Sequence, residues 1–117
     1  LLVNQDFKRG DKMIRIQGKA AGCPIWEITE KDGHYIMANG GIVTGSFDSL
    51  RTPLELLSLT FGIMPWKDTM IEAVKVIDER NGIRRDDLND WSASELLKYL
   101  AYGDRNADGV TGNWKPI

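Results

Sequence analysis

Oxygen-bearing side chains recur at alternate positions near the end of the chain, in the stretch DRNADG at 104–109. Asp104, Asn106 and Asp108 can turn their side-chain oxygens toward one point when the chain curls, and Gly109 permits the sharp bend. The backbone carbonyl of Val110 would then point inward as well. Calcium is a hard cation that takes about six to eight oxygen ligands, so this spacing predicts a calcium loop.

The D-x-N-x-D-G spacing resembles the opening of EF-hand loops, and the Gly-Asp pair at 103–104 is similar to the loops of dockerin modules. The resemblance covers seven residues, 103–109, and implies a calcium site that follows a helix. The twelfth loop position is Lys115, where the EF-hand pattern has a bidentate carboxylate. A carboxylate from outside the loop would have to complete the site, for example that of Asp86, Asp87 or Asp90. The alternative is an Asx-rich turn that satisfies its own backbone groups.

A modest basic feature lies in the first twenty residues, where five cations and two aspartates give a local net charge of +3. Its cations are Lys8, Arg9, Lys12, Arg15 and Lys19. Such an arm can lie along phosphates, so a nucleic-acid-binding accessory protein is one functional hypothesis. The alternative is a solvated strand and tail that offset the acidic residues of 21–50.

Four tryptophans occur in 117 residues. We expect Trp26 to lie in the core, and Trp66 and Trp91 to pack at the entries of two helices. Trp114 lies in the C-terminal tail, and tryptophan is enriched where proteins bind one another. The predicted partner-binding patch consists of Trp114, Tyr102 and Tyr35.

No complete catalytic constellation is present in the sequence. The predicted hairpin separates Cys23 from His34 by roughly 26 Å, which excludes a hydrogen-bonded nucleophile and base. No phosphate-binding glycine loop and no nucleophile elbow occur. We therefore predict a non-catalytic protein, and the alternative is an enzyme whose site is assembled from residues that no motif reveals.

Composition excludes several classes of protein. Lys and Arg number 15 and Asp and Glu number 17, so the net charge is −2 and gives no general attraction to nucleic acid or anionic membrane. No stretch approaches the roughly 20 apolar residues of a spanning helix, so no membrane partner is expected. The single Cys23 excludes an internal disulfide and is compatible with a cytoplasmic location, which we predict. No cofactor is expected besides the possible calcium.

The first part of the chain is predicted to form strands. Asp32-Gly33 between apolar-containing segments is a strong hairpin signal, because both central residues need positive φ. Asn39-Gly40-Gly41 predicts a second turn. The expected strands cover 13–17, 25–31, 34–38 and 42–44, as an antiparallel meander of three or four strands.

The second part is predicted to form three helices. Each begins at a capping-box pair, Thr52 with Glu55, Thr69 with Glu72, and Ser92 with Glu95. They are expected to end at Gly62, Asn81-Gly82 and Gly103. Their buried stripes are expected to include Leu54, Leu57, Phe61, Met70, Ile71, Val74, Ile77, Leu96, Leu97 and Leu100.

These elements predict an α+β fold, in which a short antiparallel meander is followed by three helices packed on one face. We expect one domain over 1–117, with a β-rich part at 12–46, a helical part at 52–103 and a loop and tail at 104–117. The leading functional hypothesis is a small binding module that docks a protein partner, by the aromatic tail or by the open edge of the meander. The calcium-stabilised module and the nucleic-acid accessory protein are the alternatives.

Overall fold

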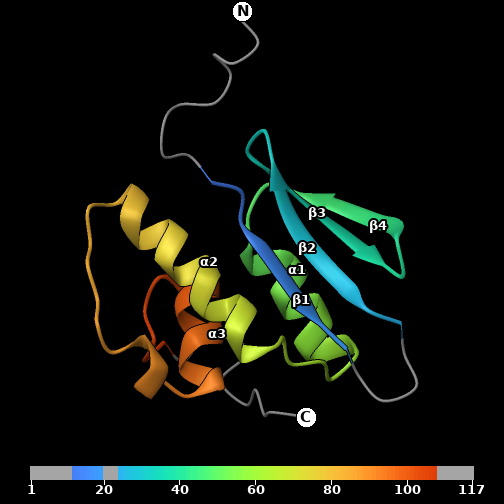
Figure 1. Cartoon of the computed structure of the whole chain (residues 1–117). Coiled ribbons are helices and arrows are strands. Elements are labelled where there is room, and N and C mark those ends of the chain that lie inside the picture. Colours follow the sequence, from blue (N-terminus) through green and yellow to red (C-terminus); the bar gives the residue numbers. More distant parts are fainter. Residues whose placement is uncertain (1–11, 20–23, 108–117) are drawn as a thin grey trace, which may run out of the picture.

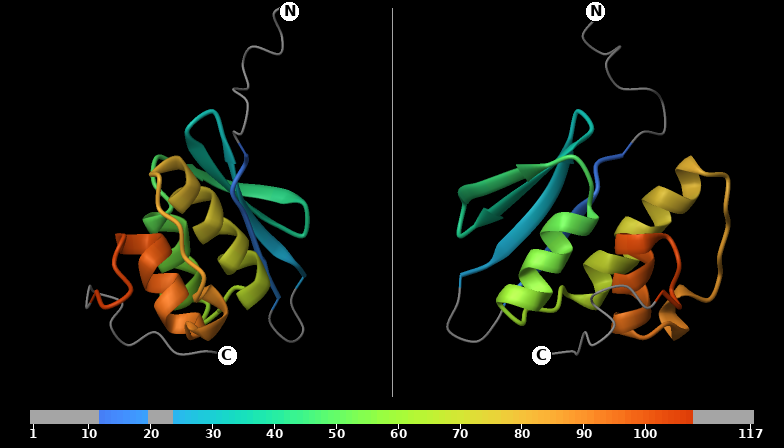
Figure 2. Two further views of the ribbon diagram at one scale, coloured as in Figure 1. Left: turned by 60° about the vertical axis from the view of Figure 1, so that its left-hand side comes forward. Right: turned by 180° about the vertical axis from the view of Figure 1, so that it is seen from behind.

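The computed structural model describes residues 12–19 and 24–107 of the chain. Four strands form one antiparallel sheet in the order β1-β2-β3-β4, which is a simple meander (Figure 1). The strands are β1 (Arg15–Gly18), β2 (Trp26–Lys31), β3 (His34–Asn39) and β4 (Ile42–Phe47). The helices follow in sequence and lie on one face of this sheet (Figure 2). The predicted α+β class is therefore confirmed.

Both predicted hairpin turns are present. Asp32 and Gly33 have φ values of 53° and 82°, and they place Lys31 opposite His34. Gly40 and Gly41 have φ values of 60° and 87° and connect β3 to β4. Two successive residues of positive φ match the right-handed twist of the flanking strands, which explains the Asp-Gly and Gly-Gly pairs.

A β-bulge interrupts the pairing of β3 with β4. Met37 lies opposite Gly45 and Ala38 lies opposite Val43, so Thr44 is the additional residue in β4. The Thr44 hydroxyl donates to the Met37 carbonyl at 3.2 Å. A bulge of this kind bends an edge strand and increases its twist.

The helical layer has three α-helices and two other helical segments. They are α1 (Arg51–Glu55), the π-helical η2 (Leu56–Thr60), α2 (Lys67–Arg80), the 3₁₀ segment η3 (Leu88–Asp90) and α3 (Ala93–Tyr102). The segment η2 continues α1 directly, and Gly62 follows with φ 65°. The N–H of Ile83 donates to the carbonyl of Asp78, and Gly82 with φ 72° ends α2 as the sequence predicts.

One of the three predicted capping boxes forms. The Ser92 hydroxyl accepts from the Glu95 N–H at 3.0 Å, and the Glu95 carboxylate accepts from the Ser92 N–H at 2.9 Å. The boxes predicted at Thr52 and Thr69 are wrong. The first helix begins at Arg51 after Leu50, whose backbone is already helical, and the second begins at Lys67 after an extended Trp66. No side chain caps either start.

The core lies between the sheet and the helices. Its strand side consists of Ile14, Ile16, Trp26, Ile28 and Met37, and its helix side includes Leu54, Leu57, Met70, Val74, Leu96, Leu97 and Leu100. Full burial of each such side chain stabilises the fold by about 1.5–3 kcal/mol. The expected burial of Phe61 is wrong, because this side chain is 61% exposed. The π turn of η2 has an i→i+5 repeat, so the residues after Leu57 leave the face that a regular α-helix would continue.

The two edges of the sheet differ. On β1, the Gln17 carbonyl accepts from the Trp66 N–H at 2.9 Å, and the Gln17 N–H donates to the Thr69 hydroxyl oxygen at 3.2 Å. The start of α2 thus provides hydrogen-bond partners for the outward-facing backbone groups of Gln17 on this edge. On β4, no strand of the described chain pairs with the outer edge. The bulge at Thr44 is the feature that limits strand addition there.

Candidate docking surface

The described half of the predicted calcium loop forms a local turn. The Asn106 N–H donates to Asp104 Oδ1 at 2.9 Å, which is the geometry of an Asx turn. Asp108 and Val110 lie outside the described residues. Within residues 12–19 and 24–107, no group of three His, Cys, Asp or Glu side chains is arranged to hold a metal ion. Calcium binding by this loop stays a prediction.

Arg105 attaches the beginning of this loop to the start of α3. Its guanidinium lies 4.7 Å from the ring centroid of Trp91, and its Nε lies 3.8 Å from Glu95 Oε2. The backbone hydrogen bond from Ser92 lowers the pKa of Glu95, and the positive charge of Arg105 acts in the same direction. The guanidinium of Arg105 therefore makes a cation–π contact with Trp91 and an ion pair with Glu95.

Two cations of the predicted basic arm lie beside carboxylates. Lys12 Nζ is 3.9 Å from Glu79 Oε1, and Arg15 Nε is 3.4 Å from Glu27 Oε2. Lys19 is exposed just after β1. Lys8 and Arg9 lie outside the described residues. Partners of opposite charge offset much of the positive field of Lys12 and Arg15, and nucleic-acid binding stays a prediction.

The aromatic side chains of the predicted partner patch belong to different contacts. Tyr35 is partly buried beside Glu30, and its burial raises its pKa, with the charge of Glu30 acting in the same direction. Tyr102 donates its hydroxyl to Glu55 and lies 4.9 Å below the guanidinium of Arg51. Trp114 lies outside the described residues. Both described tyrosines thus have hydrogen-bonding roles within the fold.

A polar network at one end of the helical layer was not predicted. Asp78 is 3% exposed, and its Oδ2 accepts from Arg85 Nε at 2.8 Å while its Oδ1 accepts from the Tyr99 hydroxyl at 2.6 Å. Arg85 Nη2 donates to the same hydroxyl at 3.0 Å. Burial raises the pKa of Tyr99, and its hydrogen bond to Asp78 acts in the same direction. The sequence contains a signal for the burial of Asp78, because this residue lies four positions after Val74 and therefore on the buried face of the helix.

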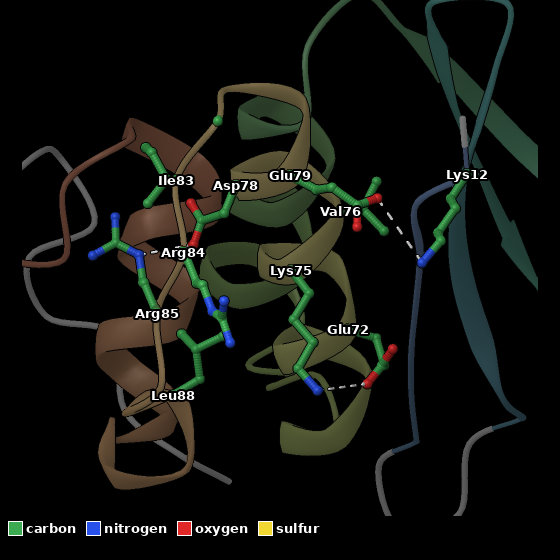
Figure 3. A pocket seen from close by; sticks show the side chains of 11 residues that line it. Lys12, Glu72, Lys75, Val76, Asp78, Glu79, Ile83, Arg84, Arg85 and Leu88 are labelled. Carbon is green, nitrogen blue, oxygen red and sulfur yellow. Dashed lines mark hydrogen bonds and ion pairs between the residues drawn. The ribbon is translucent and has the colours of Figure 1, made fainter. Parts of the chain in front are cut away.

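A pocket of about 500 Å³ opens beside this network, between the second half of α2 and the segment 82–88 (Figure 3). Most of its charged side chains pair with one another, whereas Arg84 lies 4.0 Å from Asp86 outside the pocket. Lys75 Nζ lies 3.5 Å from Glu72 Oε2. Lys12 forms an ion pair with Glu79, and Arg85 forms one with Asp78. Charges compensated in this way hold the wall of the pocket together and leave no strong net field for a charged ligand.

The opposite end of the molecule is apolar and exposed. Gly18, Trp26, Asn39 and Ile42 lie in one row across the four strands, and the end of η2 and the start of α2 lie at the same end (Figure 1). Six large apolar side chains are exposed at this end, and we call this region the apolar end. They are Ile25 at 45%, Ile42 at 71%, Val43 at 64%, Leu59 at 54%, Phe61 at 61% and Trp66 at 43%. Ile42 lies on the same sheet face as Trp26, whereas Ile25 and Val43 lie on the opposite face.

Charge is nearly absent from the segments that build the apolar end. Their described residues, 18–19, 24–26, 35–47 and 56–66, contain one charged residue, Lys19, in a chain that is 27% charged. Lys67 and the exposed Asp68 follow directly, and the Lys67 ammonium donates to the Asn89 carbonyl at 3.1 Å. The apolar end is therefore an apolar surface with few charges at its rim. The three charge-poor stretches are visible in the sequence, but helix and strand patterns assign their apolar residues to the core.

In comparisons with known proteins, no family model, no curated protein and no solved structure matches this chain. Across the described residues, no helix combines the length and the apolar character needed to cross a bilayer.

Proposed function

We propose that this protein is a non-catalytic docking module that binds a protein partner through the apolar end. The observation that carries the proposal is the gathering of six exposed large apolar side chains from three separate stretches of the chain at one end. Large apolar side chains that gather on the surface of a monomeric protein often mark interaction sites.

Two features favour docking at the apolar end over strand addition at the edge of β4. The bulge at Thr44 shortens the regular part of β4 that could pair with an added strand. The side chains of Ile42 and Val43 at its start project into solvent. Docking that buries these side chains gains the apolar free energy of about 25 cal/mol per Å² without requiring a complete strand.

The aromatic members of the apolar end fit the same role. Phe61 and Trp66 flank the connection between η2 and α2, whose intervening residues Ile63 and Met64 are buried. The buried residues hold the connection in place, and the exposed aromatic rings are presented on a fixed backbone. Rigid aromatic side chains give large contact area at low entropic cost, which is typical of binding hot spots.

The test compares two substitutions of exposed apolar residues. Phe61→Asp places a charge at the apolar end, and Ile83→Asp places the same charge at the opposite end, on a side chain that is 39% exposed. We expect tagged wild-type protein and Ile83→Asp to retain the same partner proteins in a quantitative pull-down. Phe61→Asp should retain those partners about 10-fold less, because docking would bury its carboxylate.

Thermal unfolding of both variants verifies that each is folded before the comparison. Equal retention of partners by the wild-type protein and both variants would show that the apolar end is not the docking surface. Loss of partners with Ile83→Asp alone would place the docking surface at the opposite end.

A further inference from the structure

We propose that the pocket between α2 and the segment 82–88 binds a small amphipathic carboxylate, with its carboxylate group on Arg84 and its apolar body against the pocket wall. This site is separate from the apolar end, so the inference goes beyond the proposed docking function. Three observations support it: the fixed shape of the pocket, the one unmatched charge in its wall, and the apolar side chains beside that charge.

The pocket is held in shape by contacts along the segment 82–88. At the start of the segment, the Ile83 N–H donates to the Asp78 carbonyl at 2.7 Å, and in its middle the Arg85 side chain binds the Asp78 carboxylate. At its end, Leu88 is buried in the core. The volume of about 500 Å³ lies within the range of roughly 300–1,000 Å³ that is usual for small-molecule sites. Because the pocket is already formed, binding has few additional groups to order.

One cation remains when the charges of the pocket wall are matched. The wall contains four cations and three carboxylates. Three ion pairs use all of these carboxylates, and they are Lys12–Glu79, Lys75–Glu72 and Arg85–Asp78. The remaining cation is Arg84, whose side chain extends from the segment 82–88 toward α2 (Figure 3). The unmatched positive charge of the pocket is therefore located at one side chain.

The guanidinium of Arg84 is accessible to a ligand. Its Nε lies 4.0 Å from Asp86 Oδ1, and the two side chains are 92% and 91% exposed. Water screens such an exposed pair, so a ligand can replace Asp86 at low cost. Arg85 differs, because its guanidinium already binds Asp78 and the Tyr99 hydroxyl. A planar guanidinium matches the two oxygens of a carboxylate in a bidentate arrangement, so Arg84 is the group that selects the head of the ligand.

The carboxylates of the wall favour a ligand with a single negative charge. A phosphate monoester carries about −1.5 to −2 charges near neutral pH, and the exposed Glu72 and Glu79 would repel it more strongly than a carboxylate. The ion pairs of the wall also leave no strong net field, so the charge of a ligand interacts mainly with Arg84. An inorganic anion would gain this one contact and would bury no apolar surface. The ligand that fits therefore has an apolar body as well.

Apolar side chains lie beside Arg84 and can contact such a body. Ile83 is 39% exposed, Val76 is partly buried on α2, and both line the pocket. Leu88 and the aliphatic part of Lys75 complete this part of the wall. Burial of these groups by a ligand is favourable in proportion to the apolar area removed from water. The wall thus offers an apolar contact and one cation within the same pocket.

Amide chemical-shift titration of the whole chain near neutral pH tests the proposal. The probes are phenylacetate, phenethyl alcohol and phenethylammonium, which share their apolar body and differ in the charge of the head. We expect phenylacetate to shift the signals of residues 75–88 with a dissociation constant on the order of a few mM, as is usual for a ligand of about ten heavy atoms. Phenethyl alcohol should bind about 5-fold more weakly, and phenethylammonium more weakly still.

Two substitutions separate the charged contact from the apolar one. Arg84→Gln should weaken phenylacetate binding about 5-fold and change phenethyl alcohol binding by less than about 2-fold, because the alcohol has no charge to lose. Ile83→Ser should weaken both probes by about the same factor, roughly 3-fold. Arg15→Gln, at an exposed arginine on β1 outside the pocket, is the matched control and should change neither. Thermal unfolding verifies that each variant is folded.

Four outcomes would overturn the proposal. They are the absence of shift changes up to about 20 mM phenylacetate, shift changes centred on the apolar end, equal binding of phenylacetate and phenethyl alcohol, and an Arg84→Gln variant that binds phenylacetate as the wild-type protein does. Phenyl phosphate that binds more tightly than phenylacetate would overturn the carboxylate and assign the pocket to phosphate esters. The docking function is judged separately, by the pull-down with Phe61→Asp.

Discussion

The two ends of the sheet differ in the side chains that surround them. At one end, charged side chains connect the layers: Arg80 on α2 binds Glu30 on β2, with Nη1–Oε2 at 3.0 Å and Nη2–Oε1 at 2.7 Å. Lys12 and Glu79 form a further ion pair there. At the apolar end, the connecting segments carry almost no charge and leave six apolar side chains exposed.

This contrast separates stability from recognition within one small fold. The charged end directs its side chains toward one another, so its polar groups contribute to the stability of the layers. The exposed apolar side chains of the apolar end lie outside the buried core, so they contribute little to the stability of the fold. Substitutions should therefore change stability at the charged end and association at the apolar end.

The largest effect on stability is expected for Asp78→Ala. The substitution leaves the partly buried Arg85 and Tyr99 without the carboxylate that both contact, so the free energy of unfolding should fall by about 2–4 kcal/mol. Urea denaturation followed by circular dichroism measures the change. Phe61→Ala at the apolar end is the matched comparison and should cost less than about 0.5 kcal/mol. Equal losses at the two positions would contradict the division between the ends.

A smaller effect is expected for Glu30→Gln. The two-point pair with Arg80 is partly buried, with side-chain exposures of 15% for Glu30 and 37% for Arg80, so its loss should cost about 1 kcal/mol. Chemical denaturation at low and high salt measures this cost, and added salt should reduce it. Glu72→Gln, in an exposed pair with Lys75 on one helix, is the control and should have little effect. A loss that is equal for the two variants would show that the layer-spanning pair has no special role.

The smallest effect concerns alkaline pH. Burial and the hydrogen bond to Asp78 raise the pKa of Tyr99 above its ordinary value of 10.0, so the folded protein favours the neutral hydroxyl. The resulting stability is fully present below pH 10.0 and is lost as pH rises through the folded pKa. The free energy of unfolding should therefore decline at high pH, and Tyr99→Phe should make that decline shallower. An unchanged slope in Tyr99→Phe would assign the decline to other groups, among them Tyr35, whose pKa is also raised.

The sequence predicts the features of this fold that depend on neighbouring residues. Asp32-Gly33 specifies its hairpin because only two adjacent residues are involved. Ser92 and Glu95 form their capping box because both lie within one turn. The apolar periodicity of the helices likewise predicts the burial of Leu96 and Leu97.

Features that depend on distant residues were not predictable in the same way. Thr69 has the spacing of a helix cap, but its hydroxyl binds the backbone of Gln17, which lies 52 positions away in the sequence. Arg80 and Glu30 are 50 positions apart. The π turn of η2 exposes Phe61, although its spacing after Leu57 fits a regular helix. Tertiary contacts decide these cases, and local patterns do not contain them.

The bridge from Thr69 to Gln17 also has a consequence for the order of events during synthesis. All residues of the meander are translated before Thr69, and until α2 forms, the outer edge of β1 lacks the hydrogen bonds that Trp66 and Thr69 give to Gln17. A nascent chain at that stage carries two open sheet edges, a state in which neighbouring nascent chains can pair wrongly. Completion of α2 ends this vulnerable interval at one edge of the sheet.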